Sequence, residues 1–465
     1  MTHRQRWVLV LTSIASLMVA LDVTVVSTAL STIRMHLDAS VDQLEWTVNA
    51  YGLSFAVLLM TGSALGDRFG RRRLFVLGMA LFVAASAACA LATSVGFLIA
   101  ARTVQGAGAA IISPVSLALL SAAFPPERRA WALGVFGGIT GLAVVGGPVV
   151  GGAITQGLAW QWIFWLNVPI GLAAIPFVRR QIEESFGPRA SLDAPGLLLV
   201  TVAALGIVWG LVRGNDAGWG SVEVIGTLAA GVVASVAFVI WELRAREPML
   251  PMQLFRSSSF AGGNAATLLM FGALFSAVFF MAQFLQTTLG LSPLQAGLRL
   301  VPWTGTVFIV APIAGALVER VGERPLIVGG LLMQAVGLGW VALLARTGLP
   351  YAQMIPPLIV AGVGISTALP AVQNAVVGSV APGQIGKASG TFSMMRQLGG
   401  AFGLAVGVAV FTAAGSYASP AAFSDGFGPA IGVSAALSLG GALAAMPIRA
   451  GRVSSVQPAL ETTAS

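Results

Sequence analysis

Two charged residues stand inside long apolar stretches of this chain, where a charge needs a special reason. Asp22 lies about 15 residues into the first stretch, roughly 22 Å from its start along a helix. It is the only acidic residue clearly inside such a stretch. Because a carboxylate in hydrocarbon is costly, acids within the membrane commonly mark proton or substrate pathways. Asp22 is therefore a candidate proton-binding residue, and a structural hydrogen bond to a nearby Ser or Thr is the alternative.

The second charged residue is Arg102, about seven residues into the fourth apolar stretch. A guanidinium at this depth should face a cavity or contact a partner, because hydrocarbon cannot solvate it. Arg102 either takes part in coupling to protons or satisfies backbone carbonyl groups at a break in its helix. Both roles require neighbouring helices that hold the side chain in place.

Other reactive groups are too few for an enzyme site. Cys89 is the single cysteine, and His3 and His36 lie outside the apolar stretches. They support neither a disulfide nor a metal site. The short loops hold no paired carboxylates and no nucleophile with a base. Lys387 is the only lysine, and it belongs to no glycine-rich phosphate loop. We therefore expect no enzyme activity, no metal, no cofactor and no use of ATP.

The elements that must position Asp22 and Arg102 are membrane helices. The 465 residues are 57% hydrophobic and only 9% charged, with a mean hydropathy of +0.88. Soluble domains carry roughly 25% charged residues. Apolar runs of about 20 residues are long enough to cross a hydrocarbon core of about 30 Å. Fourteen spans are predicted, near residues 7–30, 47–66, 74–92, 95–120, 131–155, 161–178, 194–212, 220–242, 260–288, 293–318, 326–345, 353–377, 389–412 and 427–447.

The net charge of +8 is distributed as in a membrane protein. Most of the 25 Lys and Arg residues fall in loops on the same side as the N-terminus. Cytoplasmic loops collect these residues, so both termini are predicted to be cytoplasmic in a plasma-membrane protein. Nucleic acid is not expected as a partner, and we expect a monomer in the lipid bilayer.

Short motifs recur at a nearly constant offset, which indicates an internal duplication. The segment from Asp67 to Gly70 after the second span is echoed by the segment from Glu319 to Gly322 after the tenth. Corresponding positions follow even-numbered spans, so the halves have parallel topology. We predict an all-α integral membrane protein of two six-helix bundles plus two inserted helices. Its parts are a first bundle (residues 1–185), the insert (186–255), a second bundle (256–450) and a disordered cytoplasmic tail (451–465).

The first loop motif comprises Asp67, Arg68, Gly70, Arg71 and Arg72. Gly70 permits a tight turn, while the charged residues can form ion pairs and cap helix ends on the inner face. Such contacts would act as a latch that favours one conformation. Anchoring of the cytoplasmic side by the arginines is the alternative.

The fifth span combines small residues with a proline, at Gly134, Gly147, Pro148, Gly151 and Gly152. Small residues on successive turns let helix backbones approach closely. Pro148 removes one backbone hydrogen bond and bends the helix. The segment can therefore pack tightly and pivot, although generic close packing would also need these residues.

Together these motifs resemble the major facilitator superfamily, and within it the 14-span drug:proton antiporter branch. Three further segments carry this resemblance: Leu21 to Val26 around Asp22, Arg102-x-x-Gln105-Gly106-x-Gly108, and the run from Trp160 to Gly171 that contains Asn167. The resemblance implies that Arg102 takes part in proton transfer, whereas coupling by Asp22 is a hypothesis from its place within a span. It also implies that the Gly147-Pro148 segment belongs to an exporter.

The sequence thus predicts a secondary transporter, driven by the proton gradient, that exports lipophilic or cationic drugs by alternating access. An exporter or importer of a metabolite or siderophore in the same fold is the alternative. Substrate sites in such proteins lie near the midplane between the halves. Polar, aromatic and polarizable residues at that depth are the candidate cavity residues: Asn49, Met60, Phe280, Gln283, Gln286 and Asn374.

Overall fold

The computed structural model describes residues 1–187, 193–381 and 384–448. All regular secondary structure within these ranges is helical. Fourteen helices there are long and apolar enough to cross a membrane, which confirms the predicted number of spans. The tail predicted at residues 451–465 lies outside the described residues, and the borders drawn at residues 185, 255 and 450 stay a prediction.

The helices follow one another along the chain with short connections. The first half contains α1 (His3–Leu37), α2 (Val41–Phe69), α3 (Arg71–Ala90), α4 (Val95–Ala123), α5 (Pro126–Gly157), α6 (Trp162–Trp165) and α7 (Asn167–Gln181). The inserted pair is α8 (Ala194–Ala217) and α9 (Val222–Arg244). The second half contains η1 (Met252–Arg256), α10 (Ser258–Thr287), α11 (Pro293–Arg299), α12 (Val301–Thr304), α13 (Thr306–Val321), α14 (Glu323–Leu344), η2 (Tyr351–Gln353), α15 (Ile355–Gly378), α16 (Ile385–Ala414) and α17 (Pro420–Ala445).

Local capping fixes several helix ends outside the apolar runs. The Ser40 hydroxyl accepts from the Gln43 backbone N–H, and the Gln43 side chain accepts from the Ser40 backbone. This capping box satisfies donors that a helix start leaves unpaired. Helix α2 therefore begins at Val41, six residues before the predicted span. As a result Glu45 lies inside α2 and is fully buried, which corrects the prediction that Asp22 is the only acid clearly within a span.

Two predicted spans are interrupted in the structure. The sixth is divided between α6 and α7, and the tenth among α11, α12 and α13. Pro169 cannot donate to the carbonyl one turn earlier, and Pro302 has the same effect in the tenth span. Hydropathy detects the length of an apolar run but not a proline break within it, so the sequence predicted continuous helices.

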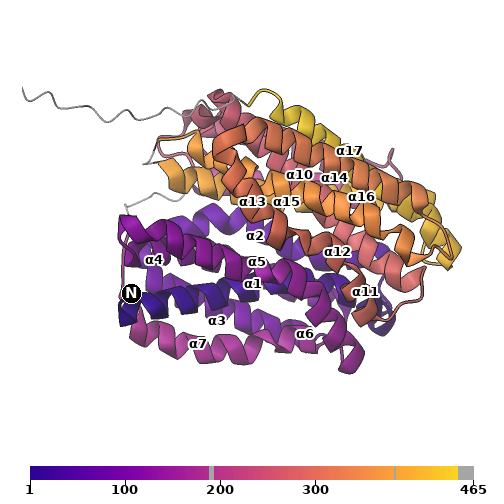
Figure 1. The fold of residues 1–465 in the computed structure, drawn as a ribbon, viewed down its shortest axis with the longest axis horizontal. Coiled ribbons are helices and arrows are strands. Elements are labelled where there is room, and N and C mark those ends of the chain that lie inside the picture. The colour runs from indigo at the N-terminus through magenta and orange to yellow at the C-terminus, as the bar shows by residue number, and fades with distance from the viewer. Residues whose placement is uncertain (188–192, 382–383, 449–465) are drawn as a thin grey trace, which may run out of the picture.

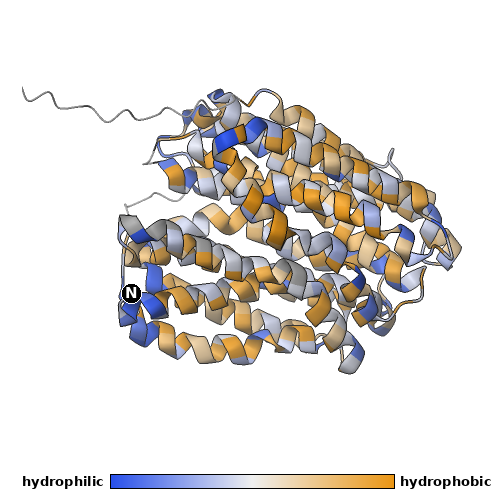
Figure 2. Ribbon diagram, in the orientation of Figure 1, coloured by the Kyte–Doolittle hydropathy of each residue, from blue (hydrophilic) through white to orange (hydrophobic). Residues whose placement is uncertain are grey.

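The two halves lie side by side with their helices roughly along the same axis (Figure 1). Helices α1 to α7 form one side of the molecule, and α10 to α17 form the other. Across the boundary α2 packs on α16, α5 on α11 and α1 on α10, while α8 packs on α16 and α2. Hydrophobic residues cover the helix sides, and hydrophilic residues gather at the ends, as a surface in lipid requires (Figure 2).

Candidate functional site

Asp22 and Arg102 meet inside the first half. Asp22 projects from α1 and Arg102 from α4, and Arg102 Nη1 donates to Asp22 Oδ2 in a direct ion pair. Each side chain is only 1% exposed. Because neither charge reaches water, each depends on the other for compensation. The structure thus brings together the two charged residues that the sequence marked separately.

Two amides complete the coordination of the Asp22 carboxylate. Its Oδ1 accepts from Gln105 Nε2 at 2.8 Å and from Asn167 Nδ2 at 3.2 Å. Asn167 Nδ2 also donates to Ser86 Oγ at 3.1 Å, and the Ser86 hydroxyl donates to the Phe164 carbonyl. With Arg102, these amides provide three donors to one carboxylate. Asn167 and Ser86 were not among the predicted site residues, and the only signal for Asn167 was the Asn-x-Pro-x-Gly segment that contains it.

The Arg102 guanidinium is held from several sides. Its Nε donates to the Thr47 carbonyl at 3.1 Å, and its Nη1 also donates to Gln105 Oε1 at 2.8 Å. Its centre lies 4.3 Å from the ring centroid of Tyr51 and 5.7 Å from that of Phe164. The contacts of Asp22, Arg102 and their partners join α1, α2, α3, α4, α6 and α7. A change in the charge of Asp22 therefore acts on a cluster that joins six helices.

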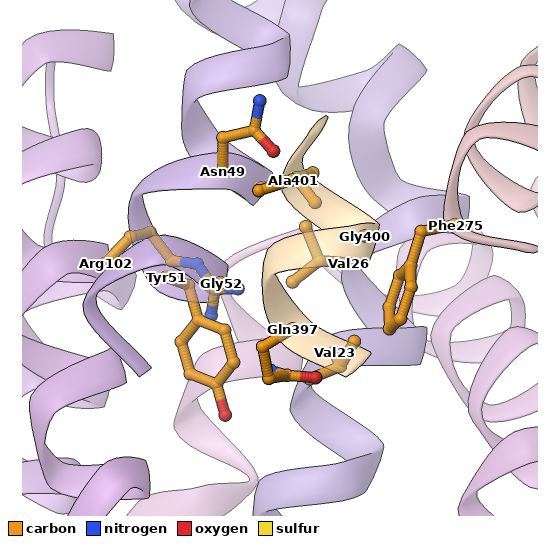
Figure 3. A pocket seen from close by; sticks show the side chains of 11 residues that line it. Val23, Val26, Asn49, Tyr51, Gly52, Arg102, Phe275, Gln397, Gly400 and Ala401 are labelled. Atoms are coloured by element: carbon orange, nitrogen blue, oxygen red, sulfur yellow. The ribbon is translucent and has the colours of Figure 1, made fainter. Parts of the chain in front are cut away.

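A small cavity lies beside this cluster, between the two halves (Figure 3). Its volume of about 30 Å³ leaves room for about one water molecule. Tyr51 and Gln397 face the same space from α2 and α16, and Arg102 lies beside the Tyr51 ring. The lining is otherwise mostly apolar or small: Val23, Val26, Val48, Asn49, Gly52, Phe275, Gly400 and Ala401. It contains no carboxylate.

Of the six predicted cavity residues, Asn49 lines this cavity and the other five do not. Two glutamines make contacts near the C-terminal end of α10. Gln286 Nε2 donates to the Thr28 carbonyl at 3.1 Å and so links α10 to α1, whereas Gln283 Oε1 accepts from the Tyr417 hydroxyl within the second half. Both amides also donate to carbonyls of their own helix.

The remaining three predicted cavity residues pack or pair elsewhere. Phe280 stacks on Phe411 with ring centroids 5.1 Å apart. Met60 lies against Gly390, where α2 meets α16. Asn374 Nδ2 donates to Glu323 Oε1 at 2.9 Å at an exposed position. These three contacts need no substrate.

The loop motif after α2 folds onto a segment of its own half. Arg71 pairs with Asp67 at 2.8 Å, and the Arg72 backbone N–H donates to Glu184 Oε1 at 2.8 Å. The Gly187 backbone N–H donates to the Asp67 carbonyl at 3.1 Å. Gly70 has a φ of 106°, a conformation that glycine adopts without strain. The motif thus fastens α2 and α3 to the segment that follows α7.

Arg68 and Arg73 take part at the edge of this loop. The Arg68 guanidinium lies 5.3 Å from the ring centroid of Phe69, and Arg73 lies 3.6 Å from Glu184 although its side chain is 71% exposed. These contacts of the motif all lie within the first half. Its action as a latch between conformations stays a prediction.

The glycines of α5 permit two unusually close helix contacts. A Cβ atom on Gly151 would lie 2.6 Å from the Val25 carbonyl of α1, and one on Gly147 would overlap Thr24. On the opposite side, a Cβ on Gly152 would lie 2.4 Å from the Pro293 carbonyl of α11.

Gly297 of α11 is equally close to the Pro148 carbonyl, at 2.2 Å for an added Cβ. The segment therefore connects the two halves by direct backbone packing, as close small-residue contacts in membranes allow. Gly134 lies in α5 as well, with its surroundings outside the described part of the chain.

A bundle of 14 membrane-spanning helices, with a buried ion pair beside a cavity between its two halves, defines a membrane transporter. The family model of the Major Facilitator Superfamily matches residues 12–404. The chain belongs to this superfamily of transporters, and it is not an enzyme.

Several relatives in sequence are named as resistance or export proteins. The tetracenomycin C resistance and export protein of Streptomyces glaucescens is 34% identical, over 85% of this chain and 73% of the relative. The methylenomycin A resistance protein of Streptomyces coelicolor is 36% identical over 83% and 82%. The cephamycin export protein of Amycolatopsis lactamdurans is 35% identical over 91% and 88%.

Solved structures support the same fold. A peptide transporter in complex with sulfate has a TM-score of 0.69 and covers 96% of both chains at 16% sequence identity. At this identity the likeness shows the fold alone, and it carries no information on what this chain transports.

Proposed function

We propose that this protein exports lipophilic small organic molecules, including antibiotics, in exchange for protons that enter along their gradient. The observation that carries the proposal is the Asp22 and Arg102 pair, buried together beside the cavity between the halves. Export as the direction is supported by the relatives, whose names describe resistance to and export of antibiotics.

Coupling to protons follows from the charge balance of the cluster. While Asp22 is ionised, it neutralises Arg102 and accepts from Gln105 and Asn167. Protonation of Asp22 would leave the Arg102 charge buried without compensation, which is strongly unfavourable. Arg102 would then need another partner, and the helices that it joins would rearrange. Proton occupancy thereby biases one conformation of the first half over another.

Alternating access is supported by the contacts between the halves. Backbone packing of α5 on α11 and the hydrogen bond from Gln286 to the Thr28 carbonyl join the halves toward one end of the bundle. With both termini inside, as proposed from the positive loops, this end faces outward. We infer that these contacts close the outer end, so that a substrate would be taken from the cytoplasmic side.

The proton gradient is the proposed energy source, and the proposed location is the plasma membrane with the protein as a monomer. A metabolite or siderophore carrier in the same fold remains the second candidate, because the mostly apolar lining does not by itself select a drug. A transport assay with chemically varied compounds separates the two.

Everted membrane vesicles test the proposal directly. Respiration acidifies their lumen, and an exporter that exchanges a drug for protons drains that gradient when the drug is added. We would add ethidium, tetracycline and nalidixic acid separately and follow a fluorescent probe of the gradient. At least one compound should collapse the gradient partly with the native chain and not with Asp22→Asn. Asp216→Asn is the matched control, because Asp216 is an exposed carboxylate at an ion pair of 3.6 Å with Arg213.

No response to any compound would favour the metabolite carrier. An Asp22→Asn variant that drains the gradient as fast as the native chain would remove Asp22 from the coupling mechanism.

A further inference from the structure

A second arginine lies next to residues that line the cavity, and it forms no ion pair in the described part of the chain. Arg396 is in α16, one turn before Gly400 and next to Gln397, both of which line the cavity. Residues four apart share one side of a helix. Its guanidinium lies 5.7 Å from the ring centroid of Phe271 on α10.

Arg396 differs from Arg102 in its partners. Arg102 has a carboxylate, a backbone carbonyl and a glutamine around it. Within the described ranges, Arg396 forms no ion pair, and its buried Nε has no hydrogen-bond partner. A guanidinium inside a membrane protein is costly without a counter-charge. The ring of Phe271 supplies only part of that compensation.

No carboxylate lines the cavity, and Arg102, which does, is paired with Asp22. Glu45 lies one turn from the lining residue Asn49 and is hydrogen-bonded to it at 2.8 Å. Arg396 is the arginine next to the lining that forms no ion pair in the described part of the chain. Asp22 alone predicts a cationic substrate, but its ion pair with Arg102 removes that attraction. An arginine without an ion pair favours a ligand that brings a negative charge.

We propose that Arg396 is a substrate-binding residue that receives an acidic group, such as a carboxylate or phenolate, of the exported molecule. The substrate class is then a lipophilic organic acid, whose apolar part contacts the lining formed by Val23, Val26 and Phe275. A planar guanidinium suits a carboxylate because it donates two parallel hydrogen bonds. Gln397 lies beside it and offers a further amide donor.

This inference rests on the proposed function for the direction of transport, but not for binding itself. When an anion leaves and a proton enters, both movements carry net positive charge into the cell. Export of an acid should therefore depend on the membrane potential more steeply than export of a neutral analogue.

Binding to the purified protein in detergent micelles provides the test. Fluorescein and rhodamine 123 share a xanthene core but carry opposite charges, and nalidixic acid adds an unrelated carboxylate as a competitor. The variants are Arg396→Gln and Arg396→Lys. The matched control is Arg299→Gln, because Arg299 also lies over an aromatic ring, 4.7 Å from the centroid of Tyr351, and no residue within one turn of it lines the cavity.

The native protein should bind fluorescein more tightly than rhodamine 123. Arg396→Gln should weaken binding of fluorescein and nalidixic acid at least about tenfold, the effect of losing a charged hydrogen bond. Arg396→Lys should recover part of this affinity, and the Arg299→Gln control should match the native protein. Rhodamine 123 binding should not fall in any variant.

The proposal is wrong if neither anion shows binding that depends on Arg396, or if rhodamine 123 is preferred and Arg396→Gln leaves this unchanged. Because binding needs no gradient, Arg396-dependent anion binding together with no proton exchange in vesicles would reject the proposed function and keep this inference. Proton exchange in vesicles without Arg396-dependent anion binding would keep the proposed function and reject this inference.

Discussion

Replacement of Asp22 by asparagine removes the negative charge of this side chain and nearly keeps its shape. The asparagine side chain would keep one oxygen that can accept from Gln105 or Asn167, but it would lose the ion pair to Arg102. Since Arg102 is 1% exposed, its charge would be buried without a partner. Removal of one member of such a pair costs about 3–5 kcal/mol of folding free energy. Asp22→Asn should therefore lower the free energy of unfolding by about this amount.

A double-mutant cycle measures how strongly the two residues depend on each other. Its second single variant is Arg102→Gln, which leaves Asp22 without its counter-charge and should lower the free energy of unfolding by a similar amount. The double variant contains no uncompensated charge. Its cost should be smaller than the sum of the two single costs by about 2–3 kcal/mol. Unfolding of the purified protein in a titration with denaturing detergent measures all three free energies. Asp216→Asn provides the baseline, since an exposed ion pair contributes at most about 1 kcal/mol.

Strictly additive costs would refute the reasoning, because they would mean that Asp22 and Arg102 do not compensate each other. A smaller loss of unfolding free energy for Asp22→Asn than for Asp216→Asn would also refute the reasoning. The result is independent of substrate, so it tests the electrostatics of the cluster before any transport assay.

Three other predictions concern separate parts of the molecule. Gly297→Val should abolish export and leave the outer end accessible to a membrane-impermeant thiol reagent at an introduced cysteine, because any Cβ there would meet the Pro148 carbonyl at 2.2 Å. Cys89, which is fully buried, should resist thiol reagents in the native protein and tolerate replacement by alanine with export near the native rate. Asp67→Asn, which removes the 2.8 Å pair with Arg71, should change the transport rate severalfold while substrate binding stays constant.

Each of these three predictions has a result that would contradict it. Native export by Gly297→Val would mean that α5 and α11 separate enough to admit a side chain. Rapid labelling of Cys89 would mean that water reaches the polar cluster. A changed affinity in Asp67→Asn would place the loop in substrate binding and not in a latch.

The sequence predicts the membrane architecture well because one physical variable decides it. A helix must supply about 20 apolar residues to cross the bilayer, and this requirement is visible in hydropathy. Glu45 and the interrupted tenth span were not predicted, since capping by Ser40 and the missing donor of Pro302 act locally and leave mean hydropathy unchanged.

The candidate site was predictable only for residues whose cost in lipid is large. Asp22 and Arg102 stand out because an uncompensated charge cannot remain in hydrocarbon. Asn167 and Ser86 are neutral, and their role depends on how six helices are rotated toward each other, which a single sequence does not determine. Gln283 and Gln286 were expected at the cavity, yet each amide donates to a carbonyl of its own helix and so needs no substrate there.

The role proposed for Arg396 was also not predictable from the sequence. The sequence places both Arg396 and Arg299 within spans. Only the three-dimensional structure distinguishes their surroundings. Arg396 is adjacent to the lining residues Gln397 and Gly400, whereas Arg299 lies over Tyr351. The packing of α16 on α2 makes one of them a candidate for substrate binding.

The central claim is that proton entry drives substrate export through Asp22. Its most direct test is the direction of proton movement in proteoliposomes that contain only this protein and a trapped pH indicator. When a transported compound flows down its own gradient, protons should move in the opposite direction, and Asp22→Asn should move the compound without protons. Protons that move together with the compound, or that do not move in the native protein, would contradict the account.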